Sequence, residues 1–155
     1  MKARFPMLTA VLVAASLLLP AQAMAQNYPD SVKQLIAATK KQIKTINMEQ
    51  FKALVDRKEA GLIIDVRQEI EFDDGHVPGA VNVPRGLIEF RIWKLVGFPD
   101  KTDMNKQMTL YCLTGARCAF AAKSLQDLGF TNVTSVDMRF EDWVKAGYPV
   151  AKPAK

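Results

Sequence analysis

Short apolar runs that alternate with helical patterns constrain the fold of this 155-residue chain most. LIIDV (62–66) and MTLYC (108–112) are predominantly apolar, as is typical of strands buried on both faces of a parallel sheet. AVNVP (80–84) and VTSVD (133–137) are two further strand candidates. Because helical patterns separate these runs, we predict an α/β fold with a mostly parallel sheet and right-handed crossovers.

Five helices are expected around these strands, within residues 30–46, 46–61, 86–96, 116–129 and 140–147. The first is amphipathic, and its lysines lie largely away from its apolar face. For the second we expect a capping box between Asn47 and Gln50 and a helix end at Gly61.

The first 25 residues have the pattern of a secretory signal. Lys2 and Arg4 precede an apolar run over residues 7–19, and Ala23 and Ala25 fit the small-residue rule for cleavage. Thirteen apolar positions are too few to span a bilayer, so no stable membrane anchor is expected. We therefore predict a signal peptide over 1–25, an N-terminal helix within 26–45, a domain over 46–150, a tail over 151–155 and a periplasmic location.

The charge of the mature chain makes nucleic acid a poor candidate partner. Without Lys2 and Arg4, the 21 basic residues fall to 19 against 16 acidic ones, a formal net charge of +3. No basic run stands beside interleaved aromatic residues.

The only two cysteines, Cys112 and Cys118, lie six residues apart where the third strand gives way to a helix. In an oxidising compartment such a pair forms a structural disulfide by default. Closing so short a loop stabilises a fold only modestly, however. The pair is therefore interpreted either as a disulfide or as part of a site.

A reactive site is favoured by the position of Cys112 at the carboxyl end of a buried strand, where ligands bind in open α/β sheets. Gly115 permits a tight loop whose backbone N–H groups point inward and bind an anion. Two charge-assisted hydrogen bonds of about 1.5–3 kcal/mol each suffice to bring a thiol pKa from about 8.5 to below neutrality.

Several signatures in order resemble the rhodanese domain. LIIDVRQEIEFDDGHVPGAVNVP (62–84) is similar to that family's first half, and YCLTGARC (111–118) to its catalytic Cys-x-x-Gly-x-Arg loop. DWVKAGYPV (142–150) resembles its closing segment. The resemblance implies a five-stranded mostly parallel sheet flanked by helices on both faces, and no cofactor or metal.

The resemblance also implies that Cys112 carries sulfur as a persulfide. The thiolate would attack a small anionic donor such as thiosulfate, and cyanide or a protein thiol would then accept the sulfur. Arg117 would hold the oxyanion of the donor, since its fork suits such groups. The implied cradle is Leu113, Thr114, Gly115, Ala116 and Arg117.

Two other functions stay open. Phosphatases and arsenate reductases of this fold have one more residue between Cys and Arg, so the spacing from Cys112 to Arg117 favours sulfur transfer over oxyanion chemistry. A non-catalytic sulfur carrier or binding module is the second alternative.

Five further residues are expected to have weaker roles. Asp65 ends a strand and is expected to support the loop, and Arg67 is expected to pair with Glu71. Arg85 follows another strand end, where it is either a rim cation that attracts the donor or a plain surface charge. His76 is expected to hold a turn, and it lacks the spacing of a metal site with the two cysteines.

Cys118 stands where the family often has serine, beside the nucleophile. It either replaces serine as a hydrogen-bond donor, resolves oxidised or persulfidated Cys112 into a disulfide, or forms a permanent disulfide. The second alternative would make activity depend on a periplasmic reductant.

Overall fold

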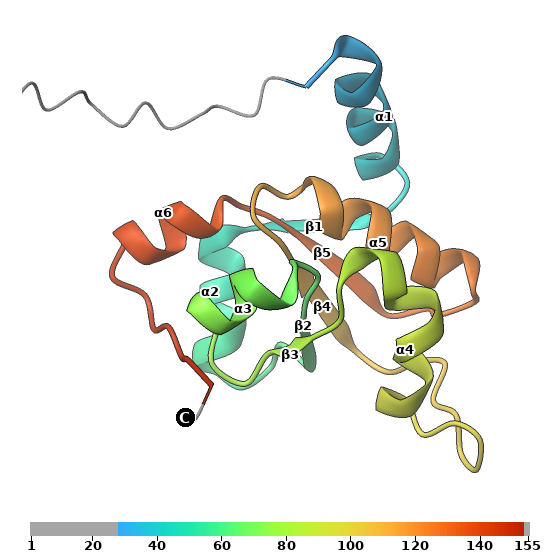
Figure 1. Cartoon of the computed structure of the whole chain (residues 1–155). Coiled ribbons are helices and arrows are strands. Elements are labelled where there is room, and N and C mark those ends of the chain that lie inside the picture. Colours follow the sequence, from blue (N-terminus) through green and yellow to red (C-terminus); the bar gives the residue numbers. More distant parts are fainter. Residues whose placement is uncertain (1–27, 154–155) are drawn as a thin grey trace, which may run out of the picture.

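A computed structural model describes residues 28–153 and contains one five-stranded sheet (Figure 1). The strands are β1 (Lys44–Asn47), β2 (Leu62–Asp65), β3 (Val81–Asn82), β4 (Met108–Tyr111) and β5 (Val133–Asp137). Their order is β1-β5-β4-β2-β3, and every pair is parallel. The predicted fold class is confirmed, because an all-parallel sheet with intervening helices is the α/β arrangement.

Helices cover both faces of this sheet (Figure 1). They are α1 (Asp30–Lys40), α2 (Met48–Asp56), α3 (Glu69–Asp74), the 3-10 turn η1 (Arg85–Leu87), α4 (Ile88–Leu95), α5 (Ala116–Asp127) and α6 (Phe140–Lys145). Ile92 of α4 and Leu125 of α5 belong to the core on one face. Phe51 of α2 and Trp143 of α6 belong to the core on the other. All four residues of β4 are buried between these cores, as its apolar sequence predicts.

Strand β1 was not predicted from the sequence. Three of its four residues are exposed, and only Ile46 is partly buried. The strand is held by parallel pairing with β5 at the edge of the sheet. The sheet therefore begins at Lys44, two residues before the expected start of the domain.

The segments predicted at the two ends of the chain lie only partly within the described residues. Helix α1 lies within the expected 26–45 segment, whereas the predicted signal peptide lies outside the described residues. The predicted tail begins with Ala151, which forms an antiparallel bridge with His76. Among residues 28–153, no helix has the length and apolar character needed to cross a membrane.

Helix α2 tests the capping predictions. The capping box between Asn47 and Gln50 is confirmed, with the Gln50 N–H donating to Asn47 Oδ1 at 2.8 Å. The predicted helix end at Gly61 is wrong, because α2 ends at Asp56 and Lys58 takes a positive φ of 57°. Gly61 instead lies close to Gln107 just before β2, where an added Cβ would be 2.4 Å from the Gln107 carbonyl oxygen.

Candidate active site

Cys112 lies directly after β4, at the edge where the carboxyl ends of the parallel strands meet. The chain then bends through Leu113 and Thr114 to Gly115, which has φ 79° and forms the N-cap of α5. The predicted strand-to-helix loop is therefore present. Cys112 has no exposed surface, and both cysteines are free thiols rather than a disulfide.

The surroundings of Cys112 favour its thiolate form. The Cys118 thiol hydrogen-bonds to the Cys112 sulfur, and this contact is the largest cause that lowers the Cys112 pKa, to about 6. Burial opposes it, while the backbone N–H groups of Cys118 and Thr114 and the charge of Arg117 act in the same direction as the thiol. The N–H groups of Thr114 in the loop and of Cys118 in α5 thus contribute to an anion site, and the Cys118 thiol is the largest single contributor.

Cys118 is the neutral member of the pair. Burial raises its pKa well above the ordinary value, and the hydrogen bond and charge of Cys112 raise it further. The Ser135 hydroxyl donates to Cys118 Sγ at 3.4 Å, and Cys118 Sγ lies 3.3 Å from the Val136 carbonyl oxygen. The single thiol proton therefore has two acceptors, the Val136 carbonyl and the Cys112 sulfur.

Gly115 allows the loop to approach β5 closely. A Cβ at this position would lie 2.5 Å from Asp137 Oδ1 and 3.3 Å from Asp137 Cα. Asp137, the last residue of β5, also binds Lys40 of α1 at 2.6 Å. The loop is fixed further by the Phe140 N–H, which donates to the Leu113 carbonyl at 3.0 Å.

Arg117 forms a two-pronged ion pair with Glu71 of α3. Its Nη1 and Nη2 lie 2.7 and 2.8 Å from the two carboxylate oxygens. The hydrogen bonds from Arg117 lower the pKa of Glu71, and those same bonds raise the pKa of Arg117. The predicted ion pair between Arg67 and Glu71 is therefore wrong, because Arg117 from the loop is the residue that binds Glu71.

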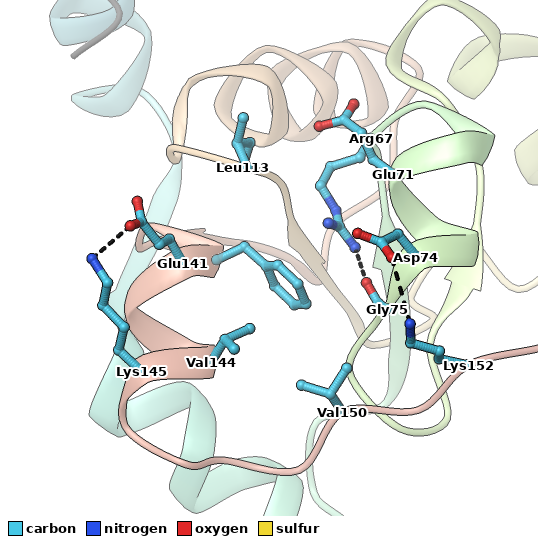
Figure 2. Close-up of a pocket in the computed structure, with 11 residues that line it drawn as sticks. Arg67, Glu71, Asp74, Gly75, Leu113, Glu141, Val144, Lys145, Val150 and Lys152 are labelled. Atoms are coloured by element: carbon cyan, nitrogen blue, oxygen red, sulfur yellow. Dashed lines mark hydrogen bonds and ion pairs between the residues drawn. The ribbon is translucent and has the colours of Figure 1, made fainter. Parts of the chain in front are cut away.

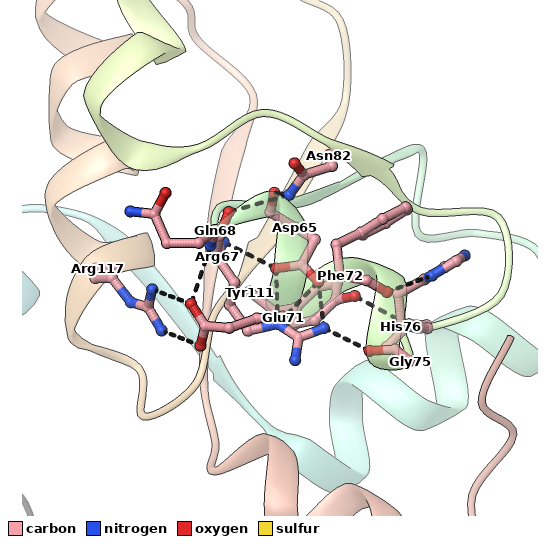
Figure 3. A network of polar contacts seen from close by, with 11 residues as sticks. Asp65, Arg67, Gln68, Glu71, Phe72, Gly75, His76, Asn82, Tyr111 and Arg117 are labelled. Atoms are coloured by element: carbon pink, nitrogen blue, oxygen red, sulfur yellow. Dashed lines mark hydrogen bonds and ion pairs between the residues drawn. The ribbon is translucent and has the colours of Figure 1, made fainter. Parts of the chain in front are cut away.

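Arg67 instead binds Asp65 in a buried network (Figure 3). Arg67 Nη2 donates to Asp65 Oδ2 at 2.6 Å and to the Gly75 carbonyl at 2.7 Å. The guanidinium carbon also lies 4.0 Å from the centre of the Phe140 ring. A buried ion pair with this many hydrogen bonds fixes the ends of β2 and α3 to each other.

Tyr111 and His76 complete the supporting structure. Burial raises the pKa of Tyr111, as do the charge of Asp65 and a hydrogen bond to it. The Tyr111 hydroxyl accepts the Val77 N–H at 3.0 Å. The His76 ring stacks on Phe72 at 3.7 Å, with Nδ1 3.0 Å from the Phe72 carbonyl. His76 thus lies at a turn, as expected, and its ring contacts that turn.

A cavity of about 730 Å³ lies beside the loop, between α3, α6 and the C-terminal segment (Figure 2). Leu113 of the loop lines it together with Phe140, Val144 and Val150. Its charged residues are paired. Glu141 and Lys145 lie 2.5 Å apart on one side, and Asp74 and Lys152 lie 3.5 Å apart on the other (Figure 2). The cavity therefore offers an apolar surface with neutralised charges.

Arg85 lies apart from this cavity. Its guanidinium binds Glu89 of α4 at 3.2 Å, and neither Arg85 nor Cys112 is among the described residues that line the cavity. A role of Arg85 in attracting a donor stays a prediction.

Four residues around the site were not singled out from the sequence: Lys40, Ser135, Val136 and Asp137. The last three belong to β5, which lies next to β4, so their position at the same sheet edge was the available signal. Lys40 gave no such signal, because α1 is remote in sequence. Within residues 28–153 no cluster of three His, Cys, Asp or Glu side chains is arranged to hold a metal ion.

With this geometry in place, comparison with known proteins assigns the family. The rhodanese-like domain matches residues 47–146, and the chain belongs to that family. The chain is 33% identical over 108 residues to thiosulfate sulfurtransferase GlpE of Pseudomonas savastanoi, covering 70% of this chain and 92% of that protein. It is 34% identical over 101 residues to the putative sulfur carrier protein YrkF of Bacillus subtilis, covering 65% of this chain and about half (51%) of YrkF.

One solved structure is similar along its whole length. It is a protein of unknown function from Rhodopseudomonas palustris, described as a possible tyrosine phosphatase. It is 30% identical with a TM-score of 0.65, and the match covers 83% of this chain and 99% of that one. The relatives of this chain thus include a sulfurtransferase and a putative sulfur carrier, and its fold also occurs in a protein described as a possible phosphatase.

Proposed function

We propose that this protein is a sulfurtransferase that moves sulfane sulfur from a donor such as thiosulfate to a thiophilic acceptor through a persulfide on Cys112. The observation that carries the proposal is the position of Cys112 directly after β4, in the loop that leads through Gly115 into α5, where hydrogen bonding lowers its pKa to about 6. A thiolate at neutral pH is the form that attacks sulfur.

The first half of the proposed reaction loads the enzyme. The Cys112 thiolate attacks the outer sulfur of thiosulfate, a sulfur–sulfur bond forms, and sulfite leaves with the electron pair of the broken bond. In the second half, cyanide or a thiol attacks the outer sulfur of the persulfide and releases the Cys112 thiolate. No cofactor takes part in either half.

Donor entry requires movement, because Cys112 has no exposed surface in this conformation. Arg117 is the cation that the loop itself provides, and its guanidinium is paired with the Glu71 carboxylate. We propose that the oxyanion of the donor replaces Glu71 on Arg117. The donor oxyanion can replace the Glu71 carboxylate because sulfonate and carboxylate oxygens bind a guanidinium in the same two-pronged way.

The acceptor is proposed to approach from the cavity beside Leu113. Its apolar lining and paired charges favour an acceptor with an uncharged, apolar surface around its thiol over a strongly charged one. This part of the proposal concerns the second half of the reaction alone.

Intact-mass analysis of reduced Cys118→Ser, in which Cys112 is the one remaining cysteine, before and after thiosulfate treatment tests the proposed function. We expect a gain of one sulfur atom that is absent from Cys112→Ser, and thiocyanate release when cyanide follows. Thiosulfate must leave the mass unchanged if the proposal is wrong.

The same assays separate the alternatives. A sulfur carrier, the description of YrkF, would gain sulfur without forming thiocyanate. A phosphatase, the possibility stated for the Rhodopseudomonas protein, would hydrolyse p-nitrophenyl phosphate and gain no sulfur.

We further propose that the mature protein begins at Gln26 and acts in the periplasm. The charged, apolar and small-residue segments of the first 25 residues support this. Cell fractionation with N-terminal sequencing tests it, and retention of Lys2 and Arg4 on the cytoplasmic protein would contradict it.

A further inference from the structure

Cys118 is a second nucleophile that the proposed sulfur transfer does not use. It is fully buried in the third position of α5 and belongs to a hydrophobic core cluster, yet its sulfur also has polar partners. The Ser135 hydroxyl donates to its sulfur at 3.4 Å, and its own thiol donates to the Val136 carbonyl at 3.3 Å. A residue that only fills space in the core needs none of these contacts.

The two cysteines lie in one buried core cluster inside the protein. Both are reduced, and hydrogen bonding from the Cys118 thiol and backbone N–H lowers the pKa of Cys112. Because Cys112 has no exposed surface, an external thiol cannot reach its sulfur atom without movement of the protein, whereas Cys118 is buried in the same core cluster. A reaction inside the site therefore has the advantage of a high effective concentration.

We propose that Cys118 is a resolving cysteine, which attacks the Cys112 persulfide, releases sulfide and leaves a disulfide between residues 112 and 118. This activity rests on the proposed function, since it begins from the persulfide. It adds a second product, sulfide, and a second outcome for the sulfur that the enzyme has taken up.

The step balances without an external oxidant. The Cys118 sulfur bonds to the inner sulfur, Cys112 Sγ, and the bond from Cys112 Sγ to the outer sulfur breaks. The outer sulfur leaves as hydrosulfide, carrying the electron pair of that bond and the proton of the Cys118 thiol. The sulfane sulfur is thus reduced to sulfide, while the two cysteine thiols are oxidised to a disulfide. A dithiol reductant then restores both thiols.

Ser135 is a positioning residue in this scheme. Its hydroxyl donates to Cys118 Sγ and so stabilises negative charge that develops on that sulfur as the proton leaves. The Val136 carbonyl holds the thiol proton when Cys112 carries no charge to accept it. These two contacts with β5 fix the position of the Cys118 sulfur.

The test is a single turnover without air or added reductant. Fully reduced wild type, Cys118→Ser and Cys112→Ser are each mixed with thiosulfate, and released sulfide, protein mass and peptide disulfides are measured. For wild type we expect about one sulfide per protein. We also expect a mass two hydrogen atoms below the reduced form and a peptide linked between residues 112 and 118. Cys118→Ser should keep the added sulfur and release no sulfide.

The outcomes distinguish this inference from the proposed function. If Cys118→Ser gains a sulfur atom and wild type also keeps it without releasing sulfide, Cys118 does not resolve the persulfide, although the transfer function stands. If neither protein gains sulfur or releases sulfide, the transfer function itself fails. Should Cys118→Ser not fold, the wild-type sulfide yield and linked peptide decide the matter alone, and Cys118→Ala provides the second variant.

Discussion

At the scale of single residues, the charge of Cys112 depends on the hydrogen-bonding group at position 118. The Cys118 thiol is the largest cause that lowers the Cys112 pKa. We predict that Cys118→Ala raises this pKa by roughly one to two units, because a charge-assisted hydrogen bond of about 1.5–3 kcal/mol is lost and one pKa unit equals about 1.4 kcal/mol. Ultraviolet absorbance of the thiolate measures the titration.

Cys118→Ser is the matched control, since its hydroxyl replaces the thiol as a donor. We expect this variant to keep the Cys112 pKa near that of wild type, about 6. Equal titration curves for the alanine and serine variants would mean that the amides and Arg117 suffice without a donor at position 118.

The ion pair with Glu71 determines whether the Arg117 guanidinium is free to bind a donor. If a donor replaces Glu71, Glu71→Gln should lower KM for thiosulfate roughly two- to fivefold, the range of a partly exposed pair worth up to about 1 kcal/mol. Arg117→Gln should raise KM. Steady-state kinetics measure both, and Glu59→Gln, which removes an exposed pair with Arg57, serves as the control. A KM that rises in Glu71→Gln would indicate that Glu71 positions Arg117 for the donor.

At the scale of elements, the junction between β4 and α5 depends on the missing side chain of Gly115. A Cβ there would lie 2.5 Å from Asp137 Oδ1, so Gly115→Ala must move the loop or β5. We predict a loss of stability of roughly 2–4 kcal/mol by denaturant unfolding, with sulfur uptake reduced, since strain at a positive φ costs about 1–3 kcal/mol before any clash.

Gly147→Ala isolates the clash from the backbone strain. Gly147 has a similar φ of 71°, but an added Cβ would meet nothing within 4 Å. We expect its loss of stability to be the smaller of the two and its sulfur uptake to be unchanged. If Gly115→Ala and Gly147→Ala lose the same amount of stability, the close approach of residue 115 to Asp137 does not contribute to the loss.

Elements with a strong hydrophobic signal were predictable, and those held by pairing alone were not. β2 and β4 are buried, and their apolar residues predicted them. β1 exposes Lys44 and Thr45, and only its backbone pairing with β5 makes it a strand. Helix α3 is six residues long without a buried residue, so it has no apolar period that could be detected in the sequence.

At the scale of the whole molecule, the buried pair of Asp65 and Arg67 connects the sheet to the segment around α3. Asp65→Ala would leave Arg67 buried without its counter-charge. We predict a loss of roughly 3–5 kcal/mol in the free energy of unfolding. Denaturant titration measures it, with Asp56→Ala as control, because the exposed pair of Asp56 with Lys52 contributes at most about 1 kcal/mol. Equal losses of stability in Asp65→Ala and Asp56→Ala would show that burial of an ion pair does not determine how much stability its removal costs.

The candidate site was predictable where chemistry follows from chain position, and less so where it follows from tertiary contacts. Cys112 and its loop were found because a strand end, a glycine and a helix start are adjacent in sequence. The partner of Glu71 was wrongly predicted as Arg67, because Arg117, which binds it, is 46 residues away in the sequence. Ser135 and Asp137 act through the neighbouring strand, and only the strand order places them at the loop.

The proposed function requires the surroundings of Cys112 to keep its sulfur negatively charged at neutral pH and able to accept sulfur. The most direct measurement is the rate of the first sulfite release after mixing reduced protein with thiosulfate, followed as a function of pH. This product does not depend on what later happens to the persulfide. We predict a rate that rises tenfold per pH unit below about 6, becomes constant above it and is absent in Cys112→Ser. A rate that keeps rising toward about 8.5, the ordinary pKa of a thiol, would contradict the proposed function.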